Sequence, residues 1–219
     1  MIAPLTELPI KGVIWYQGES NTSPERAPLY SRLFPALIAS WRRAWRQGDF
    51  PFLYVQLANY NAKPDSQWPI VREAQLTTLS TANTAMAVTI DAGEPADIHP
   101  RNKRIVAERL SLAARAMVYG ENVEYSGPAF RSAHLEGDRI RVWFTHASGL
   151  RLVRNSGFEI LGQTGEFQAA DVVVEGSSLL ISSPGVIRPK QVRYAWKDNP
   201  EATLYNGAGL PASPFRTRD

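Results

Sequence analysis

The first half of the chain contains short, largely apolar runs. They lie at Val13–Tyr16, Phe50–Tyr60 and Ala85–Asp91. Runs of this kind predict strands that are covered on both faces, as the strands of parallel sheets are. Apolar residues at helical spacing fill the intervals between the runs. The alternation of strand and helix therefore predicts an α/β sheet covered by helices.

The first interval predicts one long helix that begins near Pro28 and ends at Gly48. An apolar residue recurs there at every fourth position, which predicts the side of the helix that faces the core. This stripe consists of Leu29, Leu33, Leu37, Trp41 and Trp45. A weaker helical pattern spans 70–80. A third helix is expected from Pro100, because proline suits the first turn of a helix, and its apolar row is Val106, Leu110, Ala113 and Met117.

From about Val123 the pattern changes to short alternating runs such as RIRVWFTH, DVVVEG and SLLISSP. Gly, Pro, Asp and Ser separate these runs at intervals of roughly 8–12 residues, which is typical of antiparallel β domains. Gly120 is suited to close the preceding helix. We therefore expect two domains, an α/β domain over residues 1–120 and a β-rich domain over residues 121–219.

Polar residues follow each of the three predicted strands. They are Gln17–Asn21 after the first strand, Asn59–Asn61 after the second and Asp91–His99 after the third. Ligands of parallel sheets bind beyond the carboxyl ends of the strands. The three clusters are therefore expected to lie close together, as walls of one site.

Charge and composition narrow the classes of partner. The chain has 219 residues with 24 basic and 21 acidic side chains, a net charge of +3, and the basic residues are scattered. Nucleic-acid binding requires a clustered basic stripe, so we expect no nucleic-acid partner. No apolar run approaches the roughly 18–20 residues of a membrane span, so we expect no membrane insertion. The chain has no cysteine, which excludes disulfides, thiolate metal sites and a cysteine nucleophile.

Asp97 and His99 stand two residues apart, just before the third predicted helix. A carboxylate beside a histidine fixes the tautomer of the imidazole and stabilises its protonated form, so that the other ring nitrogen can take a proton from a serine. The same pair also fits an ordinary loop in which Asp97 caps a turn. His99 is the histidine that falls at a predicted strand end, whereas His134 and His146 belong to the β-rich half.

Three blocks of the sequence carry a family resemblance. They are IKGVIWYQGESN, DIHPRNK and VRYAWKDNPEATLYNGAGLPASPFRT. Together they resemble the sialate O-acetylesterases, a carbohydrate-esterase branch of the SGNH (GDSL-like) hydrolases, from about residue 10 to the C-terminus. The resemblance implies a flavodoxin-like, three-layer α/β/α hydrolase domain, truncated at its N-terminus, and a C-terminal antiparallel β-rich domain. The implied activity is hydrolysis of acetyl esters on sugars through a serine acyl-enzyme, with no metal and no organic cofactor.

The resemblance also implies roles for the histidine loop. His99 would be the general base and Asp97 its carboxylate partner. In the wider superfamily the acid stands three residues before the histidine, where this chain has Ala96. Here the acid stands two residues before, as in this branch.

The block after the first strand is similar to the family's oxyanion region. The side-chain amide of Gln17 is the expected donor to the oxyanion, a contribution of about 3–4 kcal/mol to the barrier. Gly18, Glu19 and Asn21 are the other expected residues of this oxyanion and substrate-binding loop. Glu19 is expected to brace the loop, for instance by pairing with an arginine.

The family's nucleophilic serine belongs to an N-terminal block like GQSNM, which this chain does not contain. Either the nucleophile lies on a segment outside this chain, or Ser20 has been recruited. Gly18-Glu19-Ser20 matches the first half of a nucleophile elbow, G-x-S-x-G, but Thr22 replaces its last glycine.

The absent serine block also favours a rival function, a non-catalytic carbohydrate-binding or interaction module. Exposed aromatic rings such as Trp143, Tyr194 and Trp196 would then stack on sugars, although such rings also suit the core of a β domain. A sheet without its first strands would expose an unpaired edge, which invites pairing. We therefore expect a homodimer through that edge, or pairing with a complementing N-terminal segment. The resemblance favours a secreted or periplasmic location.

Overall fold

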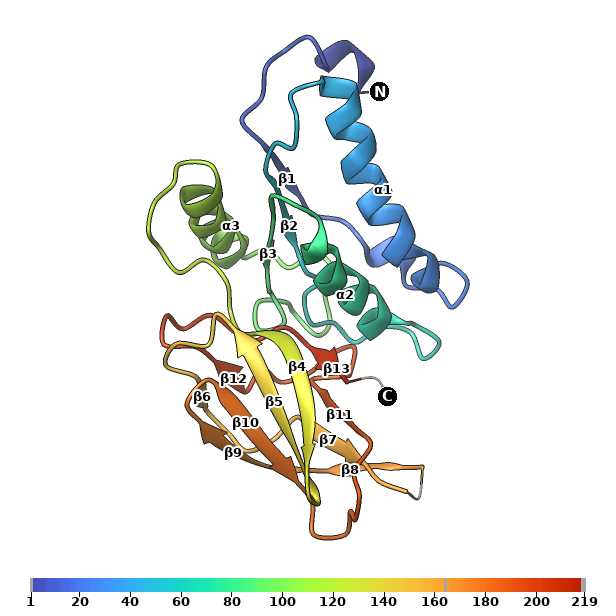
Figure 1. The fold of residues 1–219 in the computed structure, drawn as a ribbon. Helices are drawn as coiled ribbons and strands as arrows, with labels where there is room; N and C mark the ends of the chain where they lie inside the picture. Colours follow the sequence, from blue (N-terminus) through green and yellow to red (C-terminus); the bar gives the residue numbers. More distant parts are fainter. Residues whose placement is uncertain (1, 164, 218–219) are drawn as a thin grey trace. The chain divides into compact units, whose positions relative to one another are not determined.

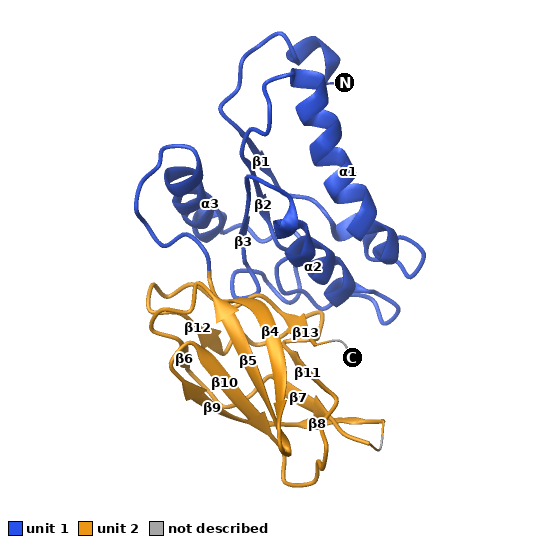
Figure 2. Cartoon of the chain, viewed as in Figure 1, with its two compact units in different colours: residues 1–126 blue, residues 127–219 orange. Residues whose placement is uncertain are grey.

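The computed structural model describes residues 2–163 and 165–217. The chain divides into two compact units, residues 1–126 and 127–219 (Figure 2). The first unit alternates strands and helices, and the second is built from antiparallel strands. The segment after the last helix belongs to the first unit, because Tyr125 packs against the core cluster around Leu53.

The first unit is built on a parallel sheet with the strand order β1-β2-β3 (Figure 1). The strands are β1 (Val13–Trp15), β2 (Phe52–Val55) and β3 (Thr84–Ala87). Every residue of β2 and β3 is buried, as in strands covered on both faces. The strands are shorter than the apolar runs because the chain leaves the sheet while it is still buried, at 56–58 and 88–90.

Helices cover both faces of this sheet (Figure 1). Helices α1 (Ala27–Trp45) and α2 (Trp68–Thr77) pack against one face, and α3 (Arg104–Met117) packs against the other. Among the described residues, the single-turn 3-10 helix η1 (Ala3–Leu5) precedes β1, and η2 (Glu19–Asn21) and η3 (Thr78–Ser80) lie in the connections.

Alternate residues of β2 face the two helical layers. The rings of Phe52 and Tyr54 contact the ring of Phe34 on α1, with centroids 6.2 and 4.9 Å apart. Leu53, which lies between them in sequence, packs with Ala85 and Ala113 under α3. The core of the unit is therefore continuous on both sides of β2.

The stripe expected on α1 is confirmed at its C-terminal end, where Trp45 is buried and Trp41 contacts the Phe52 ring, and is wrong at its N-terminal end. The helix buries Tyr30, Phe34 and Ile38, which are 3, 2 and 0% exposed, whereas Leu29 and Leu33 are 47 and 55% exposed. Large aromatic side chains bury more area than leucine, and the row that contains them reaches the rings of β2.

Helix α3 begins at Arg104 rather than at Pro100. The side-chain oxygen of Asn102 accepts a hydrogen bond from the Arg104 backbone N–H, at 3.1 Å, so the turn before the helix ends there. The apolar row expected on α3 is confirmed. Val106 and Ala113 are buried, and Leu110 and Met117 pack against the cluster that contains Ala113, as expected.

In the described part of the chain, β1 is an edge strand that pairs with β2 alone. Ile14 of β1 is in register with Leu53 of β2 and lies on the face that α3 covers. Its side chain is 69% exposed, because the cover that α3 gives to Leu53 does not extend to it. The edge is therefore both unpaired and apolar.

The described residues of the second unit form antiparallel sheets. One has the order β4-β5-β10-β9, formed by Ala129–Glu136, Arg139–Thr145, Ser178–Ser182 and Asp171–Glu175. A second has the order β13-β11-β7-β8, formed by Phe215–Arg216, Gln191–Tyr194, Phe158–Leu161 and Phe167–Ala169. Strands β12 (Leu204–Tyr205) and β6 (Arg151–Leu152) form a pair.

Of the three aromatic residues considered for sugar stacking, Tyr194 belongs to the core. It is fully buried, and its hydroxyl accepts hydrogen bonds from the backbone N–H groups of Thr203 and Leu204. Trp143 is 38% exposed and Trp196 is half-buried. These two rings are the ones that a ligand can reach.

Candidate functional site

The polar stretch after β1 turns sharply at Gly18. This residue is buried and has a φ of 151°, a backbone conformation that residues with a Cβ rarely adopt. A Cβ there would lie 3.1–3.3 Å from Leu57, Val71 and Gln75. Glycine therefore allows the chain to pass from β1 into η2 in close contact with α2 and with the residues that follow β2.

The side-chain amide of Gln17 is held at both ends. Its Nε2 donates to Asn21 Oδ1 at 2.6 Å, and its Oε1 lies 3.2 Å from the Tyr30 hydroxyl, which donates to it. Gln75 Nε2 donates to the backbone oxygen of Gln17 at 3.3 Å. The second N–H of the Gln17 amide has no acceptor among the described residues, so it can donate to a ligand oxygen.

The segment that carries His99 is anchored where it leaves β3. Arg109 of α3 donates to both carboxylate oxygens of Asp91, at 2.5 and 2.7 Å, and to the Val88 carbonyl at 2.6 Å. A guanidinium that binds a carboxylate with two parallel hydrogen bonds fixes its orientation. The start of the loop is therefore rigidly attached to α3.

The loops after β2 and β3 are joined to each other. The Gly93 N–H donates to Asn59 Oδ1 at 2.7 Å, and the Asn61 N–H donates to the Pro95 carbonyl at 3.0 Å. A Cβ on Gly93 would lie 2.2 Å from the backbone oxygen of Asn59, so this approach requires glycine. Two of the three polar clusters expected from the sequence are thus in contact.

Asp97 and His99 interact through the backbone. Asp97 Oδ1 accepts a hydrogen bond from the His99 N–H at 2.8 Å, as in an Asx turn. Within the described residues no hydrogen bond joins this carboxylate to the imidazole. Asp97 therefore shapes the loop that presents the exposed His99, and its role as a partner of the ring stays a prediction.

Lys103 connects the histidine segment with the end of β1. Its ammonium lies 5.6 Å from the centroid of the Tyr16 ring, a cation–π contact with the residue directly before Gln17. On the other side of this loop, the Gln67 N–H at the start of α2 donates to the Thr22 carbonyl at 2.7 Å. The structure thus brings the polar clusters that follow all three strands to one edge of the sheet.

Ser20 and Glu19 lie on η2. Ser20 is exposed, and its hydroxyl forms no hydrogen bond with the described residues; its backbone oxygen accepts from Arg26 at 3.3 Å. The arginine pairing expected for Glu19 is not found among the described residues. The charge of Glu19 acts instead on the neighbouring tyrosines.

Two tyrosines next to the loop stay protonated far above neutral pH. Burial, with a smaller contribution from the negative charge of Glu19, raises the pKa of Tyr16 to about 12. Burial likewise raises the pKa of Tyr30 to about 12. Both hydroxyls are therefore hydrogen-bonding groups and not charges in the working range of the site.

The raised pKa of Tyr30 predicts a loss of stability in alkali. The unfolded chain releases the tyrosine proton near pH 10 while the folded chain keeps it until about pH 12, so the stabilisation is complete below pH 10 and is lost as the pH rises to 12. The loss is at most about 1.4 kcal/mol per pH unit. Urea unfolding between these pH values should show a shallower decline in Tyr30→Phe; equal declines would contradict the assignment.

A buried polar layer supports the site from α2, and the sequence pattern does not reveal it. Arg72 is fully buried and donates to the carbonyls of Leu57 and Ala58 at 2.7 and 2.6 Å. Gln75 is 1% exposed, and its Oε1 accepts from the Leu57 N–H at 3.0 Å. In the sequence, polar residues on a helix resemble a solvated face. The available signal is that Arg72 and Gln75 each lie four residues after a buried apolar residue, Trp68 and Val71.

The described residues contain no group of three or more His, Asp and Glu side chains that could hold a metal ion. No helix in the described part of the chain has the length and apolar character needed to cross a membrane.

The parallel sheet and its helices define the first unit as an α/β unit, and its polar loops lie at the carboxyl edge of the sheet, where such sheets bind ligands. A family model described as "Carbohydrate esterase, sialic acid-specific acetylesterase" matches residues 2–114, more than half of the chain. The chain belongs to this family.

Relatives extend the likeness over both units. The chain is 33% identical over 256 aligned residues to the sialate O-acetylesterase of Rattus norvegicus, covering 100% of this chain and 46% of the relative. It is 34% identical over 249 residues to that of Homo sapiens, covering 98% and 47%. The crystal structure of a carbohydrate acetylesterase from Xanthomonas citri matches with a TM-score of 0.95 and 43% identity, covering 98% of this chain and 52% of that one. The chain spans about half the length of these relatives.

Proposed function

We propose that the chain is a carbohydrate O-acetylesterase, or forms part of one, and hydrolyses acetyl esters on sugars through a serine acyl-enzyme. The observation that carries the proposal is the contact of Lys103 with Tyr16, because it joins the His99 segment to the loop of Gln17. The relatives' names, sialate O-acetylesterase and carbohydrate acetylesterase, support it. A parallel sheet with helices on both faces suits a flavodoxin-like, three-layer SGNH hydrolase domain.

His99 is the general base in this reaction. Its imidazole takes the serine proton as the serine oxygen attacks the acetyl carbonyl carbon, and the sugar oxygen leaves with that proton. Water then attacks the acyl-enzyme, His99 takes a proton from the water and returns it to the serine oxygen, and acetate leaves. Asp97 holds the turn that presents His99.

The second N–H of Gln17 supplies the oxyanion contact. Asn21 and Tyr30 hold the amide in a fixed orientation, so it needs no reorganisation when negative charge develops on the carbonyl oxygen. Gly18 permits the turn that places the amide at the end of β1. Glu19 takes no direct part in the reaction and contributes the charge that acts on Tyr16.

Ser20→Ala decides the identity of the nucleophile. If Ser20 attacks the ester, its exposed hydroxyl is the reacting group, and acetate release from an aryl acetate should fall by at least about a thousandfold with the fold intact. Ser31→Ala is the matched control, since Ser31 is exposed and, among the described residues, its hydroxyl donates only to the Pro28 carbonyl of its own helix. Activity that persists in Ser20→Ala would assign the nucleophile to another serine, including one outside this chain.

The rival function is a carbohydrate-binding module without catalysis, and acetate release distinguishes it from the esterase. A binding module would hold an O-acetylated sugar without releasing acetate, whereas the esterase releases it. The described rings that could serve such binding are Trp143 and Trp196 of the second unit.

The exposed edge of β1 predicts self-association. We expect a second copy to pair with this edge, because the edge is unpaired and Ile14 is 69% exposed. Light scattering at micromolar concentration should report a dimer, and Ile14→Lys should shift it toward monomer. Wild-type protein that is cleanly monomeric under these conditions would contradict the expectation.

A further inference from the structure

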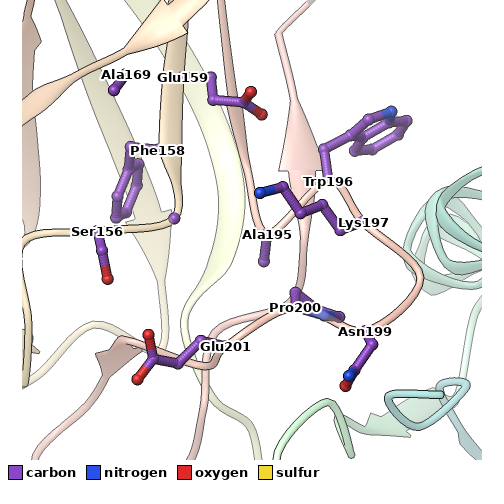
Figure 3. A pocket seen from close by; sticks show the side chains of 11 residues that line it. Ser156, Phe158, Glu159, Ala169, Ala195, Trp196, Lys197, Asn199, Pro200 and Glu201 are labelled. Atoms are coloured by element: carbon purple, nitrogen blue, oxygen red, sulfur yellow. The ribbon is translucent and has the colours of Figure 1, made fainter. Parts of the chain in front are cut away.

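The second unit contains a pocket of about 350 Å³ between the start of β7 and the loop after β11 (Figure 3). Phe158 and Glu159 come from β7, and Trp196, Lys197 and Asn199 come from the loop. The volume lies in the range of roughly 300–1,000 Å³ found for small-molecule sites.

Charged partners fix the carboxylates of the pocket wall. Arg193 donates to both oxygens of Glu159, at 2.8 and 3.1 Å, and its guanidinium carbon lies 4.0 Å from the centroid of the Phe167 ring. Glu201, on the opposite wall, pairs with Arg154. A carboxylate has about four lone-pair sites, so each still has acceptor capacity for a ligand. The Glu159 carboxylate, 25% exposed, is therefore preorganised, whereas Glu201, 53% exposed, is paired at the surface.

Two further features of the wall point to a ligand. The guanidinium carbon of Arg216 lies 4.8 Å from the centroid of the half-buried Trp196 ring, which restrains the ring. Ser156 Oγ lies in the same wall, is buried and has no hydrogen-bond partner among the described residues. A buried hydroxyl without a partner is costly, and a polar ligand that supplies the partner would remove the cost.

We propose that this pocket binds a neutral pyranose ring of a glycan. The indole of Trp196 offers an apolar surface to the C–H face of such a ring, and the carboxylates of Glu159 and Glu201 accept from its hydroxyls. Lys197 and Asn199 contribute donors. Arg193 and Arg154 neutralise the two carboxylates, so the wall selects a ligand by its hydroxyl donors rather than by its charge. The inference does not rest on the proposed hydrolysis, because binding in the second unit is measured without turnover.

The test is titration of the full chain with xylotetraose, followed by NMR or calorimetry. We expect millimolar or tighter binding, about tenfold weakening in Trp196→Ala, and no change in Trp143→Ala, whose ring is exposed but outside the pocket. Glu201→Gln should also weaken binding, and it guards against a folding defect in the tryptophan variant. The proposal would be overturned if the wild type did not bind, or if both Trp196→Ala and Glu201→Gln bound as tightly as the wild type. Tighter binding of N-acetylneuraminic acid than of xylotetraose would also overturn it.

Discussion

Arg72→Met is expected to lower the free energy of unfolding by about 3 kcal/mol. The methionine fills much of the volume of the arginine stem but donates no hydrogen bonds. The carbonyls of Leu57 and Ala58 would then lose the charged donors that now bind them at 2.7 and 2.6 Å in a fully buried environment. Buried acceptors without donors account for most of the cost.

The loss should show as a lower midpoint of thermal unfolding, by roughly 6–12 °C for a chain of this size. Arg43→Met is the matched control, because Arg43 lies exposed on α1, and surface changes usually stay within about 0.5 kcal/mol. Equal midpoints for the two variants would show that the buried guanidinium contributes no net stability.

Arg72 should also affect the site, because the two carbonyls directly precede Asn59. The Asn59 side chain accepts the hydrogen bond of Gly93, in the segment that leads to His99. If the loss of the Arg72 guanidinium shifts the segment after β2, the Asn59–Gly93 hydrogen bond will transmit the shift to the histidine loop. Activity in Arg72→Met should fall even at temperatures where the variant is folded.

His99→Ala is expected to lower kcat for hydrolysis of para-nitrophenyl acetate by about 10²–10⁴-fold, the usual contribution of a general base. KM should change little, because proton transfer stabilises the transition state and not the bound substrate. His134→Ala is the matched control. His134 is also exposed, but lies on β4 of the second unit.

The fold was predictable where one physical pattern dominates. Continuous apolar runs indicated the strands β2 and β3, which are buried on both faces. The buried side of the first turns of α1 was not predictable by the same logic, because the row of Leu29 and Leu33 and the row of Tyr30 and Phe34 are both apolar. Only the position of the β2 rings decides which row is buried.

The site was predictable as a location and less so as a set of contacts. Parallel strands place their carboxyl ends at one edge, and this rule brings the loops of Gln17 and His99 to the same edge. It does not say that Asp97 accepts from a backbone N–H rather than from the ring. Nor does it reveal Arg72 and Gln75, since buried polar residues on a helix have the same sequence pattern as solvated ones.

The most direct test of the account is acetate release from an O-acetylated methyl xyloside by this chain. We expect turnover that saturates with substrate, is lost in His99→Ala and is retained in His134→Ala. No release by the chain, or equal release by the wild type and His99→Ala, would contradict it.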